Sequence, residues 1–295
     1  MSVSTTAELR HRMGFDEPTF ALQPYIDSSP SQFDFLKPTS TVRVDGRKHS
    51  EFRKIFMRTG THSQASGSSY VELNNTKVFC TVYGPRQTAL HQFNEQANLN
   101  CTFKYTTFAE GIYTRRRFVA DEEETDVCTQ LQQALAVAVQ LSRYPKSAID
   151  VCILCVESDG NALGTAITAA SLALADAGIH MFDLISACTV AQVGPHYFLD
   201  PTADEETHQT GSVTVACMPS LNQITQLLLH GGKLTEPAVC QGIEKCLDGC
   251  ATLYGLMKQT LISAAVSEAE LIARHEEELL QHVKEMNREK GKEEA

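Results

Sequence analysis

Apolar and polar residues alternate over several segments of this 295-residue chain after residue 41, and such alternation is typical of half-buried strands. The segment "SSYVELNNTKVFCTVYG" contains two alternating runs joined by Asn74-Asn75, a pair that tolerates the positive φ of a tight turn. Val78, Cys80 and Val82 share one face of the second run. The pattern predicts a β-hairpin, and "NLNCTFKYTTF" predicts a further strand.

Other segments follow helical spacing. In "CTQLQQALAVAVQL" an apolar stripe runs from Leu131 to Leu141, which predicts a helix. The apolar run "AIDVCILCVE" predicts a buried strand, and "GTAITAASLALADAG" predicts a helix that ends at Gly178. Short strands are predicted around "SACTVAQV", "HYFLD", "SVTVACM" and "QITQLLL". A last helix is expected to begin at Thr235 and to pack an apolar stripe on the core as far as Leu261.

This order of elements predicts a single α+β domain over residues 41–265. Residues 1–40 are rich in Ser, Thr, Pro and Phe, and are interpreted either as an extended arm or as a disordered tail. Residues 266–295 are densely charged but keep a loose apolar stripe. They are expected to form an exposed helix that docks on a partner, or a frayed tail.

The formal charge is −11, from 25 basic and 36 acidic residues, and this argues against strong binding of nucleic acid by the chain alone. No run of eighteen apolar residues and no apolar leader segment is present, so neither a membrane span nor a secretory signal is expected. The ten cysteines are predicted to be buried, reduced thiols, which favours the cytoplasm or nucleus. Cys152 and Cys155 form a C-x-x-C motif, but on a strand their side chains are expected to point to opposite faces.

The turn before the central helix is a candidate phosphate seat, formed by Asn161, Gly164 and Thr165. Free N–H groups and the positive end of a helix dipole favour an anion there, but enzymes that move phosphate add a fixed cation. Residues 147–232 contain neither Lys nor Arg, and they contain nine carboxylates. The seat is therefore predicted to be structural, unless an arginine from a distant segment or a partner reaches it.

Two charged clusters have alternative interpretations. Asp200, Asp204 and Glu206 either gather Mg²⁺ or belong to an ordinary acidic loop, and the second is favoured. The basic cluster Arg115, Arg116, Arg117 either contacts RNA phosphates or pairs with neighbouring carboxylates or another subunit.

Three separated blocks resemble the RNase PH family, and the resemblance covers about residues 41–265: "VRVDGRKHSEFRKI", "GSSYVELNNTKVFCTVYGPRQ" and "GTAITAASLALADAGI". It implies an RNase PH-like ββαβα sandwich with a left-handed βαβ unit of the ribosomal-protein type, assembled into six-membered rings. Active members place a phosphate-binding arginine in the turn that reads "GNALGT" here. They also carry two aspartates six residues apart where this chain has Asp200 and Glu206, and arginines along the helix that reads "TDVCTQLQQAL". The resemblance thus implies a member that has lost phosphorolysis.

Within the family, "LDPTADEE", "VACMPSLNQITQLL" and "CLDGCATLYGLMKQTLISAA" resemble ring subunits of the eukaryotic RNA exosome. This implies a non-catalytic subunit, without cofactor or metal, in a hetero-hexameric ring with other RNase PH-like subunits. It also implies an RNA-binding cap subunit, RNA in the central channel, and a location in nucleus, nucleolus and cytoplasm. The rival hypotheses are an active phosphate-dependent 3′-to-5′ exoribonuclease, a metal-dependent hydrolase that uses Asp200, Asp204 and Glu206, and an RNA-binding module that acts alone.

Overall fold

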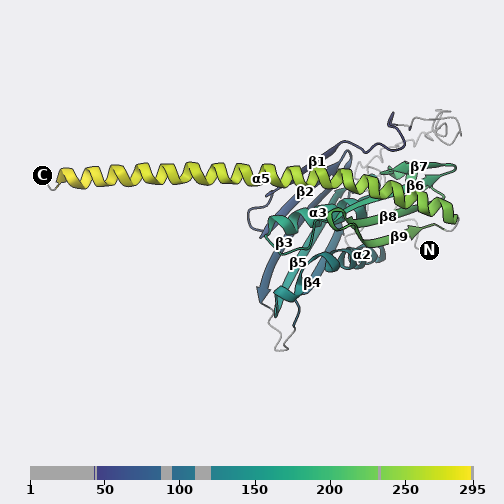
Figure 1. The fold of residues 1–295 in the computed structure, drawn as a ribbon, viewed down its shortest axis with the longest axis horizontal. Helices are drawn as coiled ribbons and strands as arrows, with labels where there is room; N and C mark the ends of the chain where they lie inside the picture. Colours follow the sequence, from purple (N-terminus) through teal and green to yellow (C-terminus); the bar gives the residue numbers. More distant parts are fainter. Residues whose placement is uncertain (1–42, 44, 88–94, 110–120, 232–233, 294–295) are drawn as a thin grey trace, which may run out of the picture.

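The computed structural model describes residues 43, 45–87, 95–109, 121–231 and 234–293, and its strands form two sheets with helices between and beside them (Figure 1). The five-stranded sheet has the order β1-β2-β3-β5-β4 and the four-stranded sheet has the order β7-β6-β8-β9. The strands of the first sheet are β1 (Ile55–Thr59), β2 (Gly67–Leu73), β3 (Thr76–Gln87), β4 (Asn98–Tyr105) and β5 (Ser147–Glu157). Those of the second sheet are β6 (Ser186–Val193), β7 (His196–Leu199), β8 (Gly211–Met218) and β9 (Gln223–His230). The helices are α2 (Glu122–Ala138), α3 (Ala162–Asp176), α4 (Ala203–Thr207) and α5 (Glu236–Glu293), with 3₁₀ turns η2 (Leu141–Arg143) and η3 (Pro219–Leu221). This mixture confirms the predicted α+β class.

The first sheet contains the predicted hairpin. β2 and β3 pair antiparallel around Asn74, which takes a φ of 54°. Alternate β3 residues, Val78, Cys80 and Val82, are fully buried as predicted. The adjacent β4 and β5 are parallel, and α2 connects them as a βαβ unit.

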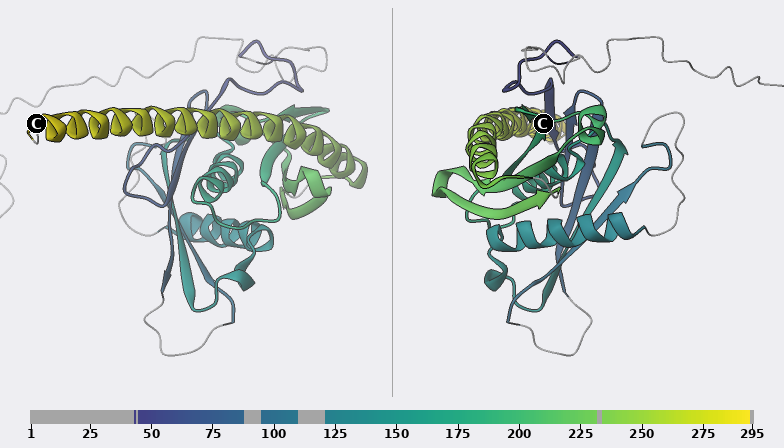
Figure 2. Two further views of the ribbon diagram at one scale, coloured as in Figure 1. Left: turned by 60° about the vertical axis from the view of Figure 1, so that its left-hand side comes forward. Right: turned by 90° about the vertical axis from the view of Figure 1, so that its right-hand side faces the viewer.

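Helix α3 is the centre of the core and contacts β2 and β3 of one sheet and β6 and β8 of the other (Figure 2). Eleven of its fifteen residues are buried, and most of them are Ala, Gly, Ser or Thr. These small side chains let both sheets approach the helix closely. Gly178 takes a φ of 68° just beyond the end of the helix, as predicted.

Helix α5 packs on the other side of the second sheet, against β6 and β8, and also contacts β1 (Figure 1). Its stripe buries Cys246, Cys250 and Met257 completely. The helix continues without interruption through residue 265 to Glu293, so the predicted domain boundary does not coincide with a break in secondary structure. The proposed arm, residues 1–40, lies outside the described residues. Among the helices that the structure describes, none combines the length and apolar character that a membrane crossing requires.

Cys152 and Cys155 lie on β5, and only Cys155 faces the core, which confirms that the motif is split between two faces. Leu141, however, does not continue the α2 stripe, because α2 ends at Ala138. Val139 turns to extended backbone and forms a β-bridge with Met181, and this tertiary pairing ends the helix.

Candidate functional site

The turn between β5 and α3 has two consecutive residues in left-handed backbone conformation. Gly160 has a φ of 79° and Asn161 a φ of 53°, which these two residue types adopt with little strain. A Cβ on Gly160 would lie 2.6 Å from the carbonyl oxygen of Pro201. The turn therefore packs directly against the segment after β7, and this close approach brings the acidic loop to the start of α3.

Glu206 occupies the anion seat at this turn. The backbone N–H of Asn161 donates to Glu206 Oε1 over 2.8 Å. Burial raises the pKa of Glu206, although this hydrogen bond acts in the opposite direction. Thr165 does not face an incoming anion, because its hydroxyl donates to the carbonyl of Asn161 within the helix. The chain's own carboxylate thus lies where an external phosphate would accept that N–H.

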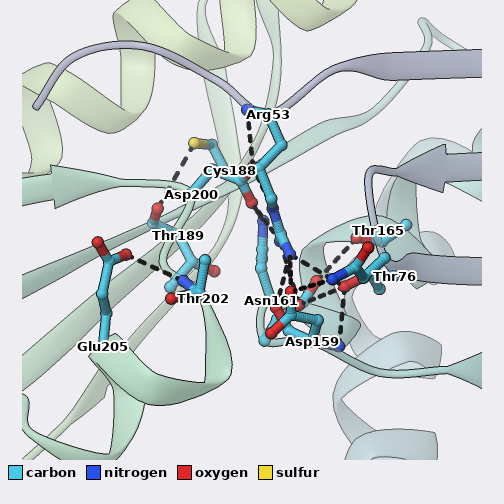
Figure 3. A network of polar contacts seen from close by, with 12 residues as sticks. Arg53, Thr76, Asp159, Asn161, Thr165, Cys188, Thr189, Asp200, Thr202 and Glu205 are labelled. Atoms are coloured by element: carbon cyan, nitrogen blue, oxygen red, sulfur yellow. Dashed lines mark hydrogen bonds and ion pairs between the residues drawn. The ribbon is translucent and has the colours of Figure 1, made fainter. Parts of the chain in front are cut away.

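An arginine from a distant segment does reach the turn, which is the alternative that the sequence left open. Arg53, just before β1, extends towards the turn and meets Asp200, which follows β7 (Figure 3). Its guanidinium donates to the carbonyl oxygens of Asp159 and Gly160 and to the hydroxyl of Thr76. The count of basic residues in residues 147–232 did not include Arg53, because Arg53 precedes its partner Asp200 by 147 residues in the sequence.

Arg53 has no donor left for a substrate. Nε donates to Asp200 Oδ2 at 2.8 Å and one terminal nitrogen donates to Oδ1 at 2.7 Å, so the pair is bidentate. With the bonds to Thr76 and the two carbonyls, all five guanidinium N–H groups are used. The side chains are 1% and 0% exposed. Burial alone would raise the pKa of Asp200, but the hydrogen bonds and charge of Arg53 outweigh it and hold that pKa below its ordinary value.

A second arginine from the segment before β1, Arg43, also holds the acidic loop in place. Arg43 Nε lies 3.0 Å from Glu205 Oε1, and both side chains are buried. Burial lowers the pKa of Arg43 to about 10, although the charge of Glu205 acts against this shift. Glu205 also accepts the backbone N–H of Thr202 in a capping box that starts α4. The segment expected to be an ordinary acidic loop therefore contains a short capped helix, α4, which Arg43 holds through Glu205.

The three carboxylates proposed as a magnesium site have different surroundings. Asp200 is bound to Arg53 and Asn161, Glu206 accepts from the turn, and Asp204 is exposed at the start of α4. Across the described part of the chain, no group of three or more His, Cys, Asp or Glu side chains is placed to hold a metal ion. Both carboxylate oxygens of the buried Asp200, and Oε1 of Glu206, accept hydrogen bonds from the protein's own donors.

A cleft of about 770 Å³ opens in front of the turn, between α2, the start of α3, α4 and the second sheet. Its lining includes three carboxylates, Glu123, Asp126 and Glu206, and among the described lining residues there is neither lysine nor arginine. Helix α2 therefore presents acidic groups to the cleft. Arg115, Arg116 and Arg117 lie outside the described residues, and their role remains a prediction.

The arginines that complete this site come from "VRVDGRKHSEFRKI", which sequence reasoning used for the family resemblance alone. The signal was present, since Arg43, Arg47 and Arg53 are densely placed in a segment that precedes a strand. What sequence alone did not show is that they converge on the loop after β7. The sequence identifies both Asn161 and Glu206 as candidates, but it does not predict their direct contact.

Comparisons with known proteins agree with the fold. The model for domain 1 of the 3′ exoribonuclease (RNase PH) family matches residues 51–180, and domain 2 matches residues 183–248. The chain is 37% identical over 229 residues to the exosome complex component RRP41-like of Arabidopsis thaliana, covering 77% of this chain and 87% of the relative. It is 39% identical over 236 residues to the exosome complex component MTR3 of Homo sapiens, covering 74% and 86%.

Solved structures show the same architecture. Rice Rrp46 superposes with a TM-score of 0.66 at 24% identity, covering 74% of this chain and all of that one. A chain of the Archaeoglobus fulgidus exosome with RNA bound to the active site gives 0.64 at 22% identity, covering 72% and 91%. The resemblance read from the three sequence blocks is confirmed: the chain belongs to the RNase PH family of 3′ exoribonucleases, and its relatives include exosome components.

Proposed function

We propose that this chain is a non-catalytic RNase PH-like subunit of the RNA exosome core. It would join other RNase PH-like subunits in a hetero-hexameric ring, support a cap subunit with RNA-binding domains, and help form the channel that leads RNA to a separate nuclease. Its similarity to exosome components over three quarters of its length supports the assembly role. Nucleus, nucleolus and cytoplasm are the locations that this role implies.

The loss of catalysis is supported by the occupied anion seat. Phosphorolysis needs an inorganic phosphate held beside the RNA end, with its charge matched by a fixed cation. Here Glu206 holds the N–H that would receive the anion, and Arg53 has all its donors engaged by Asp200, Thr76 and two carbonyls. A phosphate in this place would meet the Glu206 carboxylate and would have to displace it.

The decisive experiment measures phosphate-dependent release of nucleoside diphosphates from a 3′-labelled RNA by the purified chain. We expect no release at any phosphate concentration, and an active RNase PH serves as the positive control. At low millimolar concentration, where the general stabilising effect of phosphate on folded proteins is small, phosphate is also expected to leave the melting temperature unchanged compared with chloride at equal ionic strength, since specific binding to the folded state would raise it. Nucleoside diphosphates released by the lone chain would establish the active exoribonuclease instead.

The assembly role is tested separately, by native mass spectrometry of the complex that a tagged chain recovers from its own cells. We expect one copy of this chain with several other RNase PH-like subunits and a cap subunit. Recovery of the chain alone, or only with itself, would refute membership of the ring without bearing on catalysis.

A further inference from the structure

A polar groove of about 620 Å³ lies where α5 passes the turn between β1 and β2, residues 60–66. One wall is formed by the end of β1 and this turn, and the other by the stretch of α5 from Thr260 to Glu268. Beyond this stretch α5 extends away from the sheets (Figure 1). The groove therefore lies where the packed part of α5 gives way to its long extension.

The titratable side chains that line the groove are Arg58, His62, Asp176 and Glu268. Arg58 and His62 are exposed on the wall formed by β1 and the turn, and neither forms an ion pair with a residue that the structure describes. Nδ1 of His62 accepts the N–H of Gln64, so Nε2 carries a proton that it can donate. Asp176 is already engaged, because it accepts the N–H of Ser68 over 2.8 Å. One wall of the groove thus offers two basic side chains to an anion.

The opposite wall carries two serines one helical turn apart, Ser263 and Ser267. Both are exposed, and each hydroxyl donates to the carbonyl oxygen three residues earlier over 2.8 Å. Ser267 is followed directly by Glu268 and, at the third position, by Glu270. The residues at the same two positions after Ser263 are apolar. Kinases with a basic substrate cleft select serines followed by carboxylates, because the carboxylates pair with that cleft, so the sequence distinguishes Ser267 from its neighbour.

Ser267 can be reached by an enzyme without disturbance of the core. All residues from 265 to 270 are exposed, and the buried residues of α5 that the structure describes end at Met257. A kinase binds its acceptor in extended conformation, so this stretch of helix has to open. Because the opening exposes no buried side chain, it requires only the loss of local helical hydrogen bonds.

We propose that Ser267 is a phosphorylation site, and that Arg58 and His62 bind its phosphate across the groove. The kinase transfers the γ-phosphoryl group of ATP to Ser267 Oγ. The new bond joins Oγ to phosphorus, the bond from phosphorus to the β-phosphate oxygen breaks, ADP leaves, and the hydroxyl proton passes to the kinase's catalytic base. The phosphate brings a charge of about −1.5 to −2 at pH 7 and three acceptor oxygens.

The charges around Ser267 direct this phosphate into the groove. Glu268 and Glu270 repel it on its own helix, whereas the opposite wall attracts it. The guanidinium fork of Arg58 matches the phosphate oxygens, and Nε2 of His62 donates a further hydrogen bond. Binding there joins α5 to the β1–β2 turn, so the phosphate holds the helix extension at a fixed angle to the domain. This role is independent of the proposed ring.

Treatment of the full-length chain with ATP and a serine kinase that selects carboxylates after its acceptor tests the site, with mapping by mass spectrometry. Ser267 is expected to be modified at least about tenfold faster than Ser263, its matched control in exposure, hydrogen bonding and position in the groove. Glu268→Gln combined with Glu270→Gln should abolish this preference. Equal modification of the two serines, or none of Ser267, would overturn the proposal.

The chain recovered from its own cells, with phosphatases inhibited, gives the corresponding measurement in vivo. A phosphate on Ser267 is expected in that sample, and Ser267→Ala should remove it. A sample without any modified Ser267 would overturn the proposal as well.

The binding of the phosphate in the groove is measured by phosphorus NMR of the modified chain. A neighbouring guanidinium favours the dianion, so Arg58→Gln is expected to raise the pKa of the Ser267 phosphate. Arg143→Gln is the control and should leave that pKa unchanged, because Arg143 is an exposed arginine on η2, outside the groove. The effect of Arg58→Gln should shrink in about 1 M salt. A phosphate whose pKa does not respond to Arg58→Gln would overturn its binding in the groove.

Discussion

The buried Arg53–Asp200 pair is predicted to contribute strongly to the stability of the fold, and Asp200→Asn is the variant that tests it. Asparagine keeps the size of the side chain and tolerates the φ of 51° at this position, so the change is mainly one of charge. It leaves the Arg53 guanidinium 1% exposed and without its bidentate partner, so that the nearest remaining ion pair is the one with Asp159 Oδ2 at 4.0 Å. Removing one partner of a buried pair costs about 3–5 kcal/mol.

This loss translates into a large thermal shift. In a protein of this size each kcal/mol lowers the melting temperature by roughly 2–4 °C, so a fall of about 6–20 °C is expected. Asp204→Asn is the control, because Asp204 lies exposed in the same loop and should shift the melting temperature by no more than about 2 °C. Calorimetry of the three proteins at pH 7 is the assay. A melting temperature for Asp200→Asn within about 2 °C of the wild type would refute the reasoning.

The pH dependence provides an independent check of the same pair. The pKa of Asp200 is lowered in the folded protein, so its contribution is complete above its ordinary pKa of 3.8 and is lost as the pH falls through the lower folded value. The difference in unfolding free energy between the wild type and Asp200→Asn should stay constant from pH 7 to about 4.5 and shrink below 3.8. A difference that shrinks already near pH 6 would point to another group.

Three further outcomes are expected. Burial raises the pKa of Glu206 above 4.5, so the ionised carboxylate costs stability at pH 7 and Glu206→Gln should melt at or above the wild-type temperature there. This gain should vanish below pH 4.5, and melting curves across that range measure it. Gly67→Ala should lower the melting temperature by several degrees, because the added Cβ would clash with the backbone of α3. In the control, Gly255→Ala, the added Cβ has no atom within 4 Å, and the melting temperature should rise slightly. In the native protein a thiol reagent should modify the exposed Cys240 rapidly and Cys80 only after unfolding, because Cys80 is buried and burial raises its pKa. Equal modification rates of the two cysteines, measured by mass spectrometry, would contradict this.

Local patterns predicted most of the fold, because alternation and helical spacing report directly on which side of an element is buried. The β2–β3 hairpin and the C-terminal end of α3 at Gly178 followed from such patterns. The end of α2 did not, since Val139 leaves the helix to pair with Met181, a contact that no local pattern encodes. Pairings between distant segments were the part that sequence reasoning could not supply.

In the candidate site, too, the local features could be predicted from sequence and the contacts between distant segments could not. Residues of the turn and the acidic loop were identified from their types and spacing, but their neutralisation by Arg53 depends on a contact between the start of β1 and the end of β7. The short helix α4 had a local signal, the capping box between Thr202 and Glu205, which the density of charge in that segment obscured. Loss of the phosphate-binding arginine stays a prediction that the phosphorolysis assay decides.

The length of α5 has a mechanical consequence. Residues 266–293 extend about 40 Å as a single rod beyond the part of the helix that packs on the sheets (Figure 1). Because the first part of α5 packs on the sheets, the helix moves with the domain. A small rotation of the domain therefore displaces the C-terminal end of the helix much further than it displaces the domain surface. A partner bound at the end of the helix would therefore be displaced far more than the domain itself.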